Sequence, residues 1–148
     1  MTKNTSAQPL IHGGAQTPRA ALPHLPPLAL YIHIPWCVRK CPYCDFNSHT
    51  ASKVLPEEEY VDALLADLDQ DLHAVYGREL SSIFFGGGTP SLFSAAALGR
   101  LLKGVEARIA FAGDIEITLE ANPGTFEQEK FAAYRKLGIN RLSIGIQS

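Results

Sequence analysis

Cys37, Cys41 and Cys44 are the only cysteines in the chain, and they fall within one short stretch of sequence. Thiolates separated by three and then two residues can converge on one metal centre, and iron–sulfur clusters are the centres that usually take thiolates at such spacings. A [4Fe–4S] cluster has four irons, so three protein ligands leave one iron able to bind another molecule. An open coordination position is typical of a metal centre that does chemistry.

Two other interpretations of the cysteines compete with the cluster. A zinc site would recruit His33 or His49 as a fourth ligand in a Cys₃His set, and unpaired buried cysteines would bind nothing. Trp36 and Tyr43 flank the thiols and would either pack as ordinary aromatic residues or contact a ligand. Tyr43 is the better candidate for ligand contact because it stands between Cys41 and Cys44.

Bulk composition limits the class of protein. The 148 residues, 46% of them hydrophobic, are typical of one globular domain, and a net charge of −2 provides no basic surface for nucleic acid. No apolar run reaches the roughly 20 residues of a transmembrane helix, and prolines interrupt any signal-peptide core near the N-terminus. An odd number of clustered cysteines also favours a reducing compartment. We therefore expect a cytoplasmic protein.

A repeated pattern of strand, turn and amphipathic helix predicts βα units with a parallel sheet. Residues 1–28 lack periodicity and are expected to be a flexible leader, with the domain over residues 29–148. The expected strands are 29–34, 81–85, 114–121 and 140–146, and the expected helices are 56–76, 94–110 and 126–137. The last helix begins with a capping box at Thr125 and Gln128 and ends at Gly138. The sequence stops at the fourth strand, so we expect a fragment of about three and a half βα units.

Residue alternation gives each expected strand two different faces. Ile115, Ile117 and Leu119 alternate with polar residues that include Glu120, and the strands over 29–34 and 140–146 alternate in the same way. Parallel strands covered on both faces are normally continuous apolar runs. We therefore expect a curved sheet with helices on its apolar face and a polar inner face around a ligand. On the first helix, acidic residues opposite the apolar stripe suggest either a docking surface or an ordinary solvated face.

Ligands of parallel βα folds bind at the carboxyl ends of the strands. Four segments meet there: the cysteine loop, Gly86–Ser91, Glu120–Gly124 and Gln147. The three consecutive glycines allow a ligand to approach the backbone closely, although three glycines also occur in ordinary tight turns. The phosphate-binding and dinucleotide-binding glycine patterns are both missing. Glu120 is either a ligand contact or a satisfied polar residue.

The motifs together resemble the radical S-adenosylmethionine (SAM) superfamily, and more narrowly its oxygen-independent coproporphyrinogen III oxidase group. The resemblance covers residues 29–148 and rests on five segments in order: YIHIPWC, the C-x₃-C-x₂-C spacing, GGGTPS, LEANPG and RLSIGIQ. It implies an α/β fold that is part of a (β/α)₆ radical SAM barrel. It also implies that Cys37, Cys41 and Cys44 hold a [4Fe–4S] cluster, whose fourth iron takes the amino and carboxylate groups of SAM.

The same resemblance implies which other residues contact SAM: Tyr31, Tyr43, Gly87, Gly88, Thr89, Glu120 and Gln147. In such proteins a reduced cluster, supplied with an electron by a donor, cleaves SAM to methionine and a 5′-deoxyadenosyl radical. The polar inner face expected from the strand pattern agrees with this set.

One departure from the oxidase pattern indicates a particular branch. Oxygen-independent oxidases carry a further cysteine two residues after the third, and this chain has Phe46 there. Together with the segment CPYCDFNSH, the phenylalanine at this position resembles the heme chaperone branch. Members of that branch bind heme and pass it to acceptor proteins such as respiratory enzymes. Heme binding in that branch belongs to a C-terminal portion absent from these residues. The alternative is an oxidase that decarboxylates two propionates of coproporphyrinogen III to vinyl groups.

Overall fold

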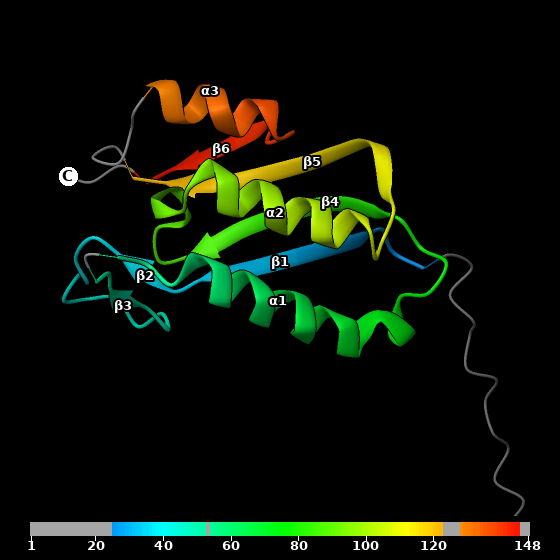
Figure 1. Ribbon diagram of the computed structural model, residues 1–148, viewed down its shortest axis with the longest axis horizontal. Helices are drawn as coiled ribbons and strands as arrows, with labels where there is room; N and C mark the ends of the chain where they lie inside the picture. Colours follow the sequence, from blue (N-terminus) through cyan, green and yellow to red (C-terminus); the bar gives the residue numbers. More distant parts are fainter. Residues whose placement is uncertain (1–24, 53, 123–127, 146–148) are drawn as a thin grey trace, which may run out of the picture.

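The computed structural model describes residues 25–52, 54–122 and 128–145 of the chain. Its main feature is a parallel sheet in the order β1-β4-β5-β6 (Figure 1). The strands are β1 (Leu28–Ile34), β4 (Leu80–Gly87), β5 (Phe111–Ala121) and β6 (Arg141–Ile144). The helices α1 (Glu57–Asp71), α2 (Ala95–Glu106) and α3 (Gln128–Lys136) connect them. The predicted α/β fold with a parallel sheet is therefore confirmed.

Four shorter elements complete the described structure. The 3₁₀ helix η1 (Leu72–Ala74) extends α1, and η2 (Pro90–Leu92) follows β4. Two-residue strands, β2 (Trp36–Cys37) and β3 (His49–Thr50), pair in parallel beside the main sheet. The sequence did not predict β2 and β3, because a strand of two residues is too short to show a periodic pattern.

Element boundaries follow local chemistry. α1 begins directly after Pro56 and has three glutamates in its first turn, where the helix dipole favours negative charge. α3 ends at Lys136, and Gly138, two residues later, has a φ of 99° that suits glycine. The N–H groups of Gly138 and Ile139 donate to the carbonyls of Arg135 and Tyr134, the pattern of a Schellman motif. Residues 1–24 of the predicted leader (1–28), the predicted cap residue Thr125 and the final residues 146–148, with Gln147, lie outside the described residues, and Leu28 already belongs to β1.

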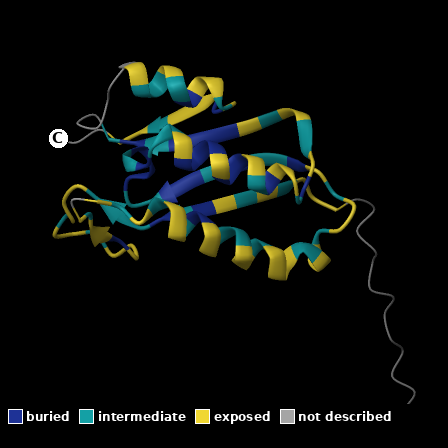
Figure 2. Ribbon diagram, in the orientation of Figure 1, coloured by how far each residue is buried: buried dark blue, intermediate teal, exposed yellow. Residues whose placement is uncertain are grey.

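The two faces of the sheet differ as the alternation predicted. Side chains of Ile32, Ile34, Ile83, Phe85 and Leu119 are buried in one core with residues of the three helices (Figure 2). Tyr31, His33, Glu116 and Glu120, at the alternate positions of β1 and β5, are exposed or only partly buried. The helices therefore cover the apolar face, and the polar face of the sheet carries the candidate site.

The apolar residues of β6 are an exception to this burial. Leu142 and Ile144 are 38% and 47% exposed, although their counterparts in the inner strands are buried. β6 is the outermost strand of the described sheet and has a hydrogen-bonded neighbour on one side only. The expected apolar face is thus open at this edge.

The acidic residues of α1 have a more specific role than either sequence interpretation suggested. Four of them bind residues of α2 or the segments that flank it: Glu57 accepts hydrogen bonds from Ser94, Glu58 and Asp62 pair with Arg100, and Asp69 pairs with Arg108. These contacts join the two helices along their length. No helix among the described residues is long and apolar enough to cross a bilayer.

Candidate functional site

The cysteine loop is closed at its base by the β2–β3 pair. His49 donates its backbone N–H to the carbonyl of Pro35 at 2.7 Å, and Ala51 donates to the carbonyl of Cys37 at 2.8 Å. Within the loop, the N–H of Cys44 donates to the carbonyl of Cys41 at 3.1 Å, which forms a tight turn between two of the thiols. These backbone bonds therefore close the loop that carries the three cysteines.

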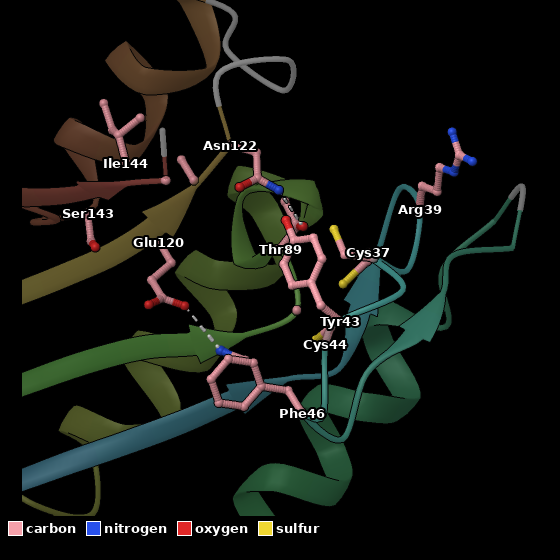
Figure 3. A pocket seen from close by; sticks show the side chains of 15 residues that line it. Cys37, Arg39, Tyr43, Cys44, Phe46, Thr89, Glu120, Asn122, Ser143 and Ile144 are labelled. Atoms are coloured by element: carbon pink, nitrogen blue, oxygen red, sulfur yellow. Dashed lines mark hydrogen bonds between the residues drawn. The ribbon is translucent and has the colours of Figure 1, made fainter. Parts of the chain in front are cut away.

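All three cysteines line one cavity of about 270 Å³ at the carboxyl ends of the strands (Figure 3). The cavity lining also includes residues from the ends of β4, β5 and β6. Five of the predicted SAM contacts line the cavity: Tyr43, Gly87, Gly88, Thr89 and Glu120. Asn122, Phe46 and Ser143 line it too, although the sequence predicted no binding role for any of the three. The meeting of strand ends at one mouth, predicted from the topology, is thus present in the structure.

The glycine-rich segment fits against the cysteine loop without side chains between them. A Cβ atom added to Gly88 would lie 2.6 Å from the carbonyl oxygen of Trp36 and 3.0 Å from the sulfur of Cys37. Gly87 has a φ of 114°, which L side chains rarely adopt. The N–H groups of Gly88 and Thr89 donate to the carbonyls of Ile34 and Trp36. Glycine at these positions therefore allows β4 to approach the cysteine-bearing strand.

The end of β5 contacts the same segment through two side chains. A carboxylate oxygen of Glu120 accepts a hydrogen bond from the N–H of Gly87 at 3.3 Å, and Asn122 donates to the hydroxyl of Thr89 at 3.2 Å (Figure 3). Partial burial raises the pKa of Glu120, and the hydrogen bond from Gly87 opposes that rise. Asn122 belongs to the LEANPG segment, which was predicted to lie at the site. Its residue type alone gave no sign of the contact with Thr89.

The three aromatic residues considered for the site, Trp36, Tyr43 and Tyr31, lie in different surroundings. Trp36 packs among Tyr60 and Phe93, with ring centroids 4.7 and 5.6 Å away, so it belongs to the core that supports the loop. Tyr43 is 82% exposed and lines the cavity. Tyr31 lies on the polar face of β1 but is not among the cavity-lining residues, and its hydroxyl contacts His33. Gln147 falls outside the described residues.

Three free thiols form a donor set of the kind that iron–sulfur clusters take. Within the described part of the chain, no three His, Cys, Asp or Glu side chains are grouped closely enough to hold one metal ion. A zinc ion needs all its ligands within about 2.3 Å of one point, whereas each thiolate of a cluster binds a different iron. Three unpaired thiols around a shared cavity are compatible with the second arrangement.

Three thiols, a glycine-rich strand end and a carboxylate surround one cavity at the carboxyl ends of a parallel βα sheet, the place where ligands of such folds bind. The chain belongs to the Radical SAM superfamily, whose sequence model matches residues 31–148. A solved structure of coproporphyrinogen III oxidase (HemN) from Escherichia coli, described as a radical SAM enzyme, aligns with a TM-score of 0.75 and 35% identity. The alignment covers 82% of this chain and 28% of that one.

Curated proteins of similar sequence indicate which branch of the superfamily the chain resembles. The chain is 60% identical over 124 residues to the heme chaperone HemW of Escherichia coli K12, covering 84% of this chain and 33% of the relative. It is 40% identical over 137 residues to the bovine mitochondrial radical S-adenosyl methionine domain-containing protein 1, covering 92% and 30%. The resemblance to the heme chaperone branch is thereby confirmed. The chain spans about a third of the length of the curated relatives it matches.

Proposed function

We propose that this chain forms the cluster-binding and SAM-binding part of a cytoplasmic heme chaperone, which binds heme and passes it to acceptor proteins. The observation that carries the proposal is the single cavity shared by the three cysteines, the glycine-rich end of β4 and Glu120. Identity of 60% to a protein named heme chaperone HemW supports the choice of function. Three unpaired cysteines support a reducing compartment.

In this proposal Cys37, Cys41 and Cys44 hold a [4Fe–4S] cluster, which supplies one-electron chemistry to SAM when both are bound. The chain itself supplies position and charge. The backbone of Gly87 and Gly88 can approach the cofactor closely because neither carries a side chain. Glu120 offers a carboxylate that can accept hydrogen bonds from a donor in SAM, such as its amino group or ribose hydroxyls.

A second candidate function is oxygen-independent coproporphyrinogen III oxidation, which the structural similarity to HemN favours. Phe46 argues against it, because it occupies the place of the oxidases' further cysteine and brings an apolar ring to the cavity lining. The two candidates share the cluster and SAM, so only the fate of the porphyrin separates them.

The test uses the whole protein that contains this chain, reconstituted anaerobically with iron and sulfide. We expect about four irons per chain, the content of a [4Fe–4S] cluster, and an electron paramagnetic resonance (EPR) signal of the reduced cluster that changes when SAM is added. Alanine at Cys37, Cys41 or Cys44 should abolish cluster retention. Colourless protein with bound zinc would contradict the proposed cluster.

Heme titration and an activity assay distinguish the two functions. A heme chaperone should shift the heme absorption spectrum on binding and release heme to an apo-acceptor, and it should form no protoporphyrinogen from coproporphyrinogen III with SAM and a reductant. Formation of protoporphyrinogen would instead establish the oxidase.

A further inference from the structure

His33 makes contacts with three separate parts of the candidate site. Its Nε2 atom lies 2.8 Å from the carbonyl oxygen of Asn47, in the returning limb of the cysteine loop. Its Nδ1 atom lies 3.0 Å from the hydroxyl of Tyr31. Its ring also fills the space beside Gly87, where an added Cβ would lie 2.6 Å from Cε1. One imidazole thus joins the loop, β1 and the glycine-rich segment.

These partners define the tautomer of the neutral ring. A backbone carbonyl only accepts, so the Nε2 atom of His33 must carry a proton and donate it to Asn47. The Nδ1 atom is then unprotonated and accepts a hydrogen bond from the Tyr31 hydroxyl. Burial, and then the negative charge of Glu120, raise the pKa of Tyr31, so the phenol keeps the proton that this bond requires. The Tyr31 oxygen is left with its lone pairs, as an acceptor only.

The segment that His33 contacts, which carries Asn47 and Ser48, also contacts the cysteines. Ser48, the residue after Asn47, is buried, and its hydroxyl lies 3.6 Å from the sulfur of Cys44. Lys40 donates to the carbonyl of Ser48 at 3.1 Å. A displacement of Asn47 would therefore be passed directly to Cys44 and to the segment that carries Cys41.

We propose that His33 is a positioning residue of the cofactor site: as the Nε2–H tautomer it holds the cysteine loop against Gly87, and by accepting the Tyr31 proton it leaves the Tyr31 oxygen as an acceptor for the SAM contact that the family resemblance implies. This inference rests on the proposed function, because it assigns His33 a task at the same site. It also explains why His33, a candidate zinc ligand from sequence, has both ring nitrogens engaged by protein atoms.

Two amide variants separate the two tasks of the ring. Asparagine reaches the position of Nδ1 and glutamine that of Nε2, so His33→Asn loses the bond to Asn47, whereas His33→Gln keeps it and loses the bond to Tyr31. In the reconstituted whole protein, we expect His33→Asn to lose most of its iron. We expect His33→Gln to retain iron but bind SAM about tenfold more weakly in an EPR titration, the size of one hydrogen bond.

Tyr60→Phe is the matched control. The Tyr60 hydroxyl donates to the backbone carbonyl of His33 at 2.8 Å, a bond that does not use either ring nitrogen. Its loss should lower the melting temperature while iron content and SAM affinity stay unchanged. The double variant Tyr31→Phe/His33→Gln should bind SAM as well as the single variant with the lower affinity. The two effects should not add, because both substitutions remove the same contact.

A measurement without cofactors tests the tautomer itself. Nitrogen chemical shifts of ¹⁵N-histidine-labelled apo-protein should show His33 protonated at Nε2 only, with the signal assigned by its disappearance in His33→Gln. Protonation at Nδ1 would overturn the inference, as would wild-type SAM affinity in His33→Gln or an equal loss of affinity in Tyr60→Phe. If wild-type protein shows no cluster or no response to SAM, the proposed function fails and the inference with it.

Discussion

Gly87 donates its backbone N–H to a carboxylate oxygen of Glu120 at 3.3 Å, and this bond links the ends of β4 and β5 at the mouth of the candidate site. The relationship depends on strand parity, because Glu120 lies on the polar face while Leu119 and Ala121 are buried on the other. It also depends on Gly87, whose backbone conformation presents the N–H to the carboxylate. A carboxylate held in this way is partly desolvated but remains available to the cavity.

The raised pKa of Glu120 predicts how the apo-protein responds to pH. Burial raises the pKa of Glu120 in the folded protein above its pKa in the unfolded chain. The contribution of Glu120 to stability is therefore complete below the unfolded pKa and is lost as pH rises through the folded pKa. Glu120→Gln removes this dependence. We expect the variant to gain stability relative to wild type as pH rises above the acid range, measured by urea unfolding from pH 4 to pH 8. Its SAM affinity should fall, and a parallel pH dependence in both proteins would contradict the burial of this carboxylate.

Gly88→Ala should damage the site through backbone contact. The added methyl would meet the carbonyl oxygen of Trp36 at 2.6 Å, and a backbone atom next to a predicted cluster ligand cannot move away as a flexible side chain can. We expect lower iron retention and a loss of stability of about 1–3 kcal/mol, typical of overpacking. Gly113→Ala is the control, because nothing lies within 4 Å of its added Cβ. Equal iron content in the two variants would refute the close approach of β4 to the cysteine loop.

Tyr134 anchors α3 to the segment after β4. Its buried hydroxyl lies 3.0 Å from the carbonyl of Ser91 and 2.5 Å from that of Phe93. Tyr134→Phe leaves both carbonyls without this donor, so we expect a loss of about 1–3 kcal/mol in the free energy of unfolding. Tyr76→Phe, at a residue that is 93% exposed, should change stability little.

Burial raises the pKa of Tyr134, with a smaller contribution from the negative charge of Glu57. The stabilising contribution of this phenol is therefore complete below its unfolded pKa near 10 and is lost only as pH rises further. The difference in unfolding free energy between wild type and Tyr134→Phe should stay constant from pH 6 to pH 9. A steady decline over that range would show that the phenol is not buried as described.

The elements and their faces were predictable because they depend on periodicity. Alternation in β1 and β5 identified the buried apolar side chains, but Thr118, on the predicted polar face of β5, is buried as well. Side-chain contacts between distant elements were not predictable. The acidic residues of α1 gave no signal that Glu57 and Asp69 would bind Ser94 and Arg108, because charge patterns do not specify which helix lies alongside.

In the candidate site, too, the placement of the segments was predictable, whereas individual contacts between them were not. The topology predicted that the cysteine loop, the glycine segment and Glu120 would share one end of the sheet, and they line one cavity. The roles of Asn122 and Asn47 were missed, since one acts through an ordinary amide and the other through a backbone carbonyl. The contacts of His33 with Asn47 and Gly87 were not predictable, because these residues lie in segments whose distance from β1 the sequence does not give.

The contact between Glu57 and Ser94 offers a quantitative test of how α1 and α2 are joined. The Glu57 carboxylate accepts from both the N–H and the hydroxyl of Ser94, at 2.7 and 2.6 Å, while the Ser94 hydroxyl accepts from the N–H of Ala97 as the N-cap of α2. Ser94→Ala should cost about 1 kcal/mol or more, because it removes the cap as well as one bond to Glu57. In a double-mutant cycle with Glu57→Ala, we expect a coupling of about 0.5–3 kcal/mol. The control is Glu59→Ala, at an exposed residue in the same first turn of α1, which should show no coupling to Ser94. Equal coupling for both glutamates would indicate a diffuse charge effect in place of the direct contact.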